Sequence, residues 1–234
     1  MMAPLLSITA VPPHLRFNGY VRSGYRSISS PLACAVGALT TISNETGNIA
    51  THALAAAAFG WVTSDAALWV ALPAHYVLVR ILFACATFTM LGSVGYHTFM
   101  AACGTAAAYE ALLLFDVVGV WVLGVSVTIM STLYGYLLTP PGVKWTVVAL
   151  IVLPSLWRLV MAKSAGDRGI AFAIIAFSRL TLSFYRLIAA PTPGDLGDGA
   201  FVWVCACCDL CCASDCYHPC VACFVYVVVC VVLF

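Results

Sequence analysis

The stretch Ala111–Leu138, ALLLFDVVGVWVLGVSVTIMSTLYGYLL, contains a single charged residue, Asp116. A helix needs about 20 mostly apolar residues to cross a bilayer, and this stretch exceeds that length. The rest of the chain has the same character, with 63% hydrophobic and 8% charged residues, whereas about a quarter of a soluble domain is charged. The sequence therefore predicts an integral membrane protein whose surrounding partner is the lipid bilayer. Its fold class is an all-α, polytopic transmembrane helix bundle.

Other apolar runs flank this stretch on both sides. They are Ile49–Leu72, Tyr76–Met100, Trp145–Met161 and Ile170–Ala190, and a shorter run, Val221–Phe234, ends the chain. We expect five spanning helices, with the last run as a candidate sixth. A short uncharged helix near residues 32–40 is expected at the membrane interface. The chain thus divides into an N-terminal segment (1–47), a helix bundle (48–190) and a cysteine-rich C-terminal segment (191–234).

The distribution of positive charge predicts the orientation, because short cytosolic loops are rich in Lys and Arg. Three arginines lie between residues 16 and 26, and the loop between the fourth and fifth helices holds Lys163 and Arg168. The opposite side offers only Lys144. We expect a cytosolic N-terminus, while the identity of the membrane stays open. No basic stripe is present, which argues against a nucleic-acid partner.

The C-terminal segment differs from the rest in composition. Nine of the twelve cysteines lie between Cys205 and Cys230, and no Lys or Arg follows Arg186. Dense cysteines can form disulfides, bind a metal or carry palmitate. Two explanations remain open: a genuine cysteine-rich module, or coding DNA read in another frame.

A few polar groups lie at the predicted cytosolic ends of the first three helices. Ser93 and His97 are four residues apart and share a helix face, and Asp116 lies about a turn into the next helix. One hypothesis makes Ser93 and Asp116 catalytic and His97 a metal ligand, although a catalytic zinc usually has three protein ligands. The alternative is a buried hydrogen-bonded pair of His97 and Asp116 that fixes helix packing. Glu45 is expected to cap the first helix, and His52 to serve packing and hydrogen bonding.

Three ordered motifs resemble the progestin and adipoQ receptor family, which includes adiponectin-receptor and haemolysin-III-like proteins. Asn44–Asn48 with Ile49 and Thr51-His52 is similar to its NETGNIWTH signature, with Ala50 in place of the Trp. The upstream Phe17–Tyr20 and Gly24–Arg26 resemble its GYR approach segment. The second motif is Ser93–Phe99, with a Ser four residues before a His, and the third is Leu114–Val120, similar to LDYxGI. In addition, Tyr134–Tyr136 falls where the family has an aromatic cluster.

The resemblance implies a seven-helix bundle with a cytosolic N-terminus, of which five to six helices are recognisable here. It also implies a zinc site made by His97 and a downstream HxxxH pair, with Asp116 holding or activating a zinc-bound water. This chain has no HxxxH, and His218 is the only histidine after His97. We therefore expect that zinc, the cofactor implied by the family, is not retained.

The implied function is receptor-like signalling or lipid sensing, with a lipid or a small hormone-like molecule as ligand. The alternatives are a zinc-dependent, ceramidase-like amide hydrolase and a degenerate family member with neither ligand nor catalysis. The sequence does not define an oligomeric state.

Overall fold

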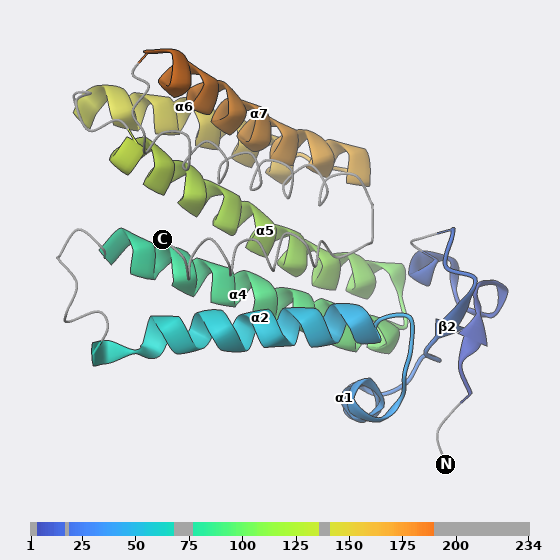
Figure 1. Cartoon of the computed structure of the whole chain (residues 1–234). Helices are drawn as coiled ribbons and strands as arrows, with labels where there is room; N and C mark the ends of the chain where they lie inside the picture. Colours follow the sequence, from blue (N-terminus) through green and yellow to red (C-terminus); the bar gives the residue numbers. More distant parts are fainter. Residues whose placement is uncertain (1–3, 17–18, 68–76, 136–140, 190–234) are drawn as a thin grey trace. The chain divides into compact units, whose positions relative to one another are not determined.

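The computed structural model describes residues 4–16, 19–67, 77–135 and 141–189, and this part of the chain is built almost entirely from helices (Figure 1). The helices are α1 (Pro31–Thr40), α2 (Thr46–Ser64), α4 (Val77–Phe99), α5 (Ala106–Gly135), α6 (Pro141–Val160) and α7 (Ala165–Ala189). Three 3₁₀ turns, η1 (Ile8–Ala10), η2 (Pro13–Leu15) and η4 (Met100–Ala102), accompany them. The predicted all-α fold class is confirmed. The cysteine-rich segment and the candidate sixth helix lie outside the described residues.

Three helical stretches are long and apolar enough to cross a membrane. They are Val77–Ala102, Ala106–Met130 and Pro141–Val160, with mean hydropathies of 1.9, 2.3 and 1.6. Few of their side chains are buried inside the protein, as expected for helices that face lipid. α2 and α7 form helices where the sequence predicts spans, and their crossing of the bilayer remains a prediction.

Residues favourable at a helix N-terminus stand at the starts of α1 and α6. Ser30 precedes α1 and its Oγ accepts a hydrogen bond from the Ala33 amide at 3.3 Å, which is the usual N-cap arrangement. α6 begins at Pro141, a residue whose fixed φ and missing N–H suit the first helical position. Ser30 thus supplies a partner for an amide that has none inside the helix, whereas Pro141 has no amide that needs one.

The described residues fall into two compact units, which divide within α5 between Val122 and Leu123. In the second unit α6 packs along α7, and the Lys144 Nζ donates a hydrogen bond to the Leu133 carbonyl at 3.0 Å. That bond gives a partner to a carbonyl in the last turn of α5, where helix carbonyls lack intrahelical donors.

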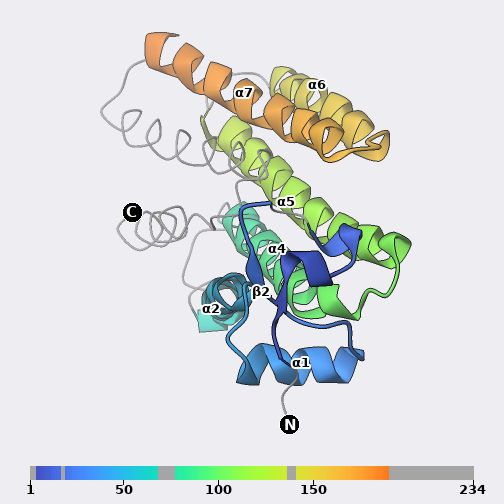
Figure 2. The same cartoon turned by 90° about the vertical axis from the view of Figure 1, so that its right-hand side faces the viewer.

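The first unit contains a small N-terminal lobe, formed by β1 (Leu6–Ser7), η1, η2 and β2 (Ser23–Tyr25) and packed on the ends of α4 and α5 (Figure 2). In the lobe, β1 pairs with β2 in antiparallel fashion. The buried core joins side chains of the lobe to side chains of η4, α4 and α5: Val11, Leu15, Tyr25, Tyr96, Met100, Cys103 and Tyr109. The N-terminal segment is thus an integral part of this unit, which places its residues next to the helix ends.

Helices α2 and α4 pack against each other along their length, and α5 approaches α4 closely. Thr89 Oγ1 of α4 donates to the Gly119 carbonyl of α5 at 2.7 Å. A Cβ at Gly119 would lie 3.1 Å from the Thr89 Cα. This small-residue contact brings the polar residues of α4 and α5 to the same level of the unit.

Candidate functional site

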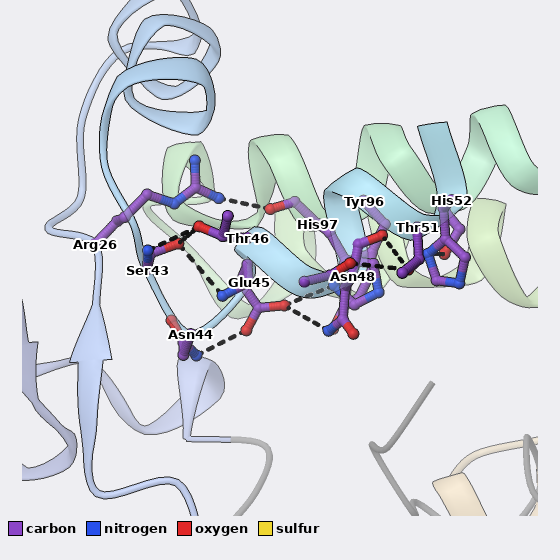
Figure 3. A network of polar contacts seen from close by, with 12 residues as sticks. Arg26, Ser43, Asn44, Glu45, Thr46, Asn48, Thr51, His52, Tyr96 and His97 are labelled. Carbon is purple, nitrogen blue, oxygen red and sulfur yellow. Dashed lines mark hydrogen bonds and ion pairs between the residues drawn. The ribbon is translucent and has the colours of Figure 1, made fainter. Parts of the chain in front are cut away.

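The link between α1 and α2 folds so that Glu45 turns toward the helices (Figure 3). Ser43 donates its amide to Thr46 Oγ1 at 2.8 Å, and the Glu45 amide donates to Ser43 Oγ at 3.3 Å. Such Ser and Thr bonds stabilise turns next to helix starts. As a result only 3% of Glu45 is exposed, in a chain that holds few charges.

The Glu45 carboxylate accepts hydrogen bonds from three side chains. Oε1 accepts from Asn44 Nδ2 at 2.7 Å, and Oε2 accepts from Asn48 Nδ2 at 3.1 Å and lies 2.7 Å from His97 Nδ1. Burying a carboxylate is costly unless donors surround it, and these three donors meet that requirement. Glu45 occupies the N-cap position of α2, but its side chain makes no capping bond there. The expected capping role is therefore replaced by a bond across to α4.

His97, whose side chain is 6% exposed, lies beside a second imidazole. Its ring and that of His52 are stacked, with centroids 5.6 Å apart and planes inclined by 26°. The His52 Nδ1 lies 3.1 Å from Ser93 Oγ. Ser93 is therefore the partner of His52, whereas the sequence grouped it with His97. The expectation that His52 serves packing and hydrogen bonding agrees with this geometry.

Asp116 of α5 completes the group. Its carboxylate lies close enough to Ser93 and His97 to interact with both. Its Oδ1 is buried and has no hydrogen-bond partner within the described part of the chain. The structure thus brings Ser93, His97 and Asp116 together and adds Glu45 and His52. We call these five residues the polar cluster.

Arg26 connects the polar cluster to the N-terminal segment. Its guanidinium donates Nη1 to the Cys34 carbonyl at 3.1 Å and Nη2 to the His97 carbonyl (Figure 3). Burial lowers the pKa of Arg26, and the nearby Cys34 and Glu45 act in the opposite direction. Because a guanidinium stays protonated in proteins, Arg26 holds its two carbonyls at neutral pH.

Tyr25 also lies near Glu45, and both line one cavity. Burial raises the pKa of the Tyr25 hydroxyl, and the charge of Glu45 adds to the increase. Tyr25, Arg26, Asn44 and Glu45 help to line a cavity of about 10 Å³. A space of this size is about that of one water molecule.

The expected loss of zinc from this chain remains a prediction. Catalytic zinc takes three protein ligands, and the described residues contain no group of three or more His, Cys, Asp or Glu side chains placed to hold a metal. His97 Nδ1 is bonded to Glu45, which leaves Nε2 as its remaining nitrogen. We therefore assign no reaction step to a metal here.

The sequence located Ser93, His97 and Asp116 but not the role of Glu45. The sequence contained one indication of that role, because a carboxylate beside an apolar helix needs a hydrogen-bond donor if it becomes buried. Asn48, three residues later, is a local donor, whereas His97 is far away in the sequence. Only the packing of α2 on α4 identifies that partner.

The chain matches no family model. It is 33% identical to "Progestin and adipoQ receptor family member 4" of Homo sapiens over 199 residues, which cover 84% of this chain and 70% of the human protein. It is 34% identical to the protein of the same name from Mus musculus, with the same coverage. Both alignments are long enough to include α1 to α7 in large part.

Proposed function

The chain belongs to the progestin and adipoQ receptor family, and on that premise we propose that it is a receptor-like membrane protein that senses a lipid or a small hormone-like molecule. Its apolar helices make it an integral membrane protein. The observation that carries the proposal is the polar cluster, because buried ionisable residues among membrane helices are costly and usually functional.

Asp116 provides the chemistry for recognition. Its buried Oδ1 is an acceptor with no donor in the described residues. A hydroxyl or amide N–H of a lipid or steroid-like ligand would supply that donor while its apolar body lies among the helices. Hydrogen bonds to charged groups contribute about 1.5–3 kcal/mol.

Arg26 provides a route from the ligand to the N-terminal segment. It bonds the carbonyl of His97, whose side chain bonds Glu45 at the start of α2. A ligand that moves His97 would therefore act on the segment that we place in the cytosol. This connection favours a receptor over a degenerate bundle that has packing residues only.

Photoaffinity labelling of the protein in lipid nanodiscs tests the proposal. A photoactivatable ceramide and a photoactivatable progestin are the two probes. We expect at least one probe to label the chain and to be displaced by its unlabelled form. Asp116→Ala should weaken that binding by roughly 10- to 150-fold, because a loss of about 1.5–3 kcal/mol corresponds to that range.

Glu110→Ala is the matched control, because Glu110 is an exposed acid on the same helix. Its labelling should equal that of the wild type. If neither probe labels the wild type above empty nanodiscs, or if both variants behave alike, the sensing proposal is wrong.

Zinc content separates the receptor from the hydrolase. We propose that the purified protein holds much less than one zinc per chain, that His97→Ala leaves this content unchanged, and that ceramide is not cleaved. A stoichiometric ion that is lost in His97→Ala, together with release of fatty acid from ceramide, would replace the receptor proposal with the zinc-dependent amidase.

A further inference from the structure

Helix α1 exposes a row of large apolar side chains that no part of the described chain covers. Leu32 is 77% exposed, Val36 52% and Leu39 87%, and Ile42 in the following link is 86% exposed. The spacing of four and three residues places Leu32, Val36 and Leu39 on one side of the helix. No charged residue lies between residues 27 and 43. Contiguous exposed apolar surface of this kind marks a contact with another molecule or a membrane.

The other side of α1 is fixed to the end of α4. Cys34 is buried, with Ser29 Oγ 3.2 Å from its Sγ, and its carbonyl accepts from Arg26. The Ser29 amide donates to the Ala101 carbonyl of η4 at 3.2 Å. α1 therefore has a defined position, and its apolar row is turned away from the protein.

That position is at the boundary of a spanning stretch. The apolar stretch Val77–Ala102 ends at η4, where Ser29 and Arg26 hold the segment that leads into α1. The two views show α1 running crosswise to α2 and α4, beside the start of α2 (Figures 1 and 2). A helix that crosses the end of a spanning helix lies in the plane of the membrane, at the level of its interface.

We propose that α1 is a membrane-interface helix that inserts Leu32, Val36, Leu39 and Ile42 between the lipid headgroups and the acyl chains. Ile42 carries this surface up to the start of α2, which itself exposes Leu54 and Trp61. The absence of charge in this segment makes the contact hydrophobic, so that zwitterionic lipid is sufficient. The proposal does not depend on any ligand of the polar cluster.

The test uses the full chain with the photoreactive amino acid benzoylphenylalanine at Leu39, and in a second variant at Leu32. Both positions are exposed, so folding should be preserved. Tyr20, an aromatic residue that is 93% exposed in the N-terminal lobe, is the control position. Each variant is placed in nanodiscs of phosphatidylcholine alone and of phosphatidylcholine with phosphatidylserine, and the adducts are identified by mass spectrometry.

We expect phospholipid adducts at Leu39 and Leu32, of equal yield in the two lipid compositions, and none at Tyr20. Adducts with a second copy of this chain, or no adducts at all, would overturn the proposal in favour of a protein contact or an aqueous face. Lipid adducts that form equally at Tyr20, or that require phosphatidylserine, would also overturn it, since the contact would then not be a specific hydrophobic one.

Discussion

At the scale of single residues, the bond between Glu45 and His97 joins the start of α2 to the end of α4. Both side chains are almost completely buried and lie 2.7 Å apart. Removing one side chain of such a pair takes a hydrogen bond from the other, which lies in a medium that solvates it poorly. The pair therefore couples two helices whose sequence positions are far apart.

We expect Glu45→Ala and His97→Ala each to lower the free energy of unfolding by about 1.5–3 kcal/mol, because each removes a buried hydrogen bond to a carboxylate. The double variant should lose less than the sum of the two, with a coupling energy of about 0.5–3 kcal/mol. Unfolding in mixed detergent micelles measures all four proteins. Glu110→Ala, at an exposed acid, should stay within about 0.5 kcal/mol of the wild type. Strict additivity of the Glu45 and His97 changes would contradict the pairing.

The residues of the site could be predicted from the sequence, but their hydrogen-bond partners could not. Helical spacing placed Ser93 and His97 on one face, and the predicted topology placed Asp116 at the same end of the helices. Spacing could not choose between two imidazoles as the partner of Ser93, and the structure pairs it with His52. That choice depends on how α2 is rotated against α4, which is a tertiary property.

At the scale of elements, the contact between α4 and α5 depends on a missing side chain. Gly119 lies so close to Thr89 that a Cβ would meet the Thr89 Cα at 3.1 Å. The Thr89 hydroxyl also bonds the Gly119 carbonyl. Small residues permit this kind of close approach between membrane helices.

Gly119→Ala should destabilise the protein by about 1–3 kcal/mol, because an added methyl group forces packed backbones apart. Gly95→Ala is the matched control on α4, where a Cβ would meet no atom within 4 Å. It should be neutral or stabilising by about 0.5–1 kcal/mol, since Ala favours helix more than Gly. Thermal unfolding in detergent measures both, and equal effects would show that helix propensity, not the contact, determines the result.

The start of α7 carries a cap that depends on pH. Hydrogen bonds from the Ser164 hydroxyl and from the Lys163 amide lower the pKa of Asp167 below its ordinary value of 3.8. A lowered pKa stabilises the folded state above 3.8, and this contribution is lost as the pH falls through the lower value. We expect protection of the first α7 turn against hydrogen exchange, corrected for intrinsic rates, to decrease in that window.

Asp167→Asn should remove the pH dependence of this protection and leave the first turn less protected at neutral pH. Protection that falls with acid equally in the variant would assign the effect to another group.

The sequence predicted the positions of the helices along the chain better than the contacts between segments. Five helices were predicted, and the fourth was expected at Trp145–Met161 but begins at Pro141, because proline is favoured in the first helical turn. The folded N-terminal lobe was not foreseen. Its core residues Val11, Leu15 and Tyr25 have no regular period and are buried in one cluster with residues of α4, η4 and α5. Non-local burial of this kind leaves no local pattern in a sequence.

At the scale of the whole molecule, the remaining question is which way the chain crosses its membrane. The sequence places the three arginines of residues 16–26 and the Lys163–Arg168 loop on one side and Lys144 alone on the other. The positive-inside rule then predicts that the N-terminus is cytosolic. In that orientation the polar cluster and α1 would lie at the cytosolic leaflet.

An epitope tag at residue 1 tests this orientation in cells. After digitonin opens only the plasma membrane, antibody should reach the tag, whereas a co-expressed marker inside the endoplasmic reticulum should stay inaccessible until a stronger detergent is added. Intact cells should show no surface tag. A tag that appears only after the internal marker does, or on intact cells, would reverse the orientation. The polar cluster would then face away from the cytosol, because Glu45 and His97 lie at the same end of α2 and α4 as the N-terminal lobe.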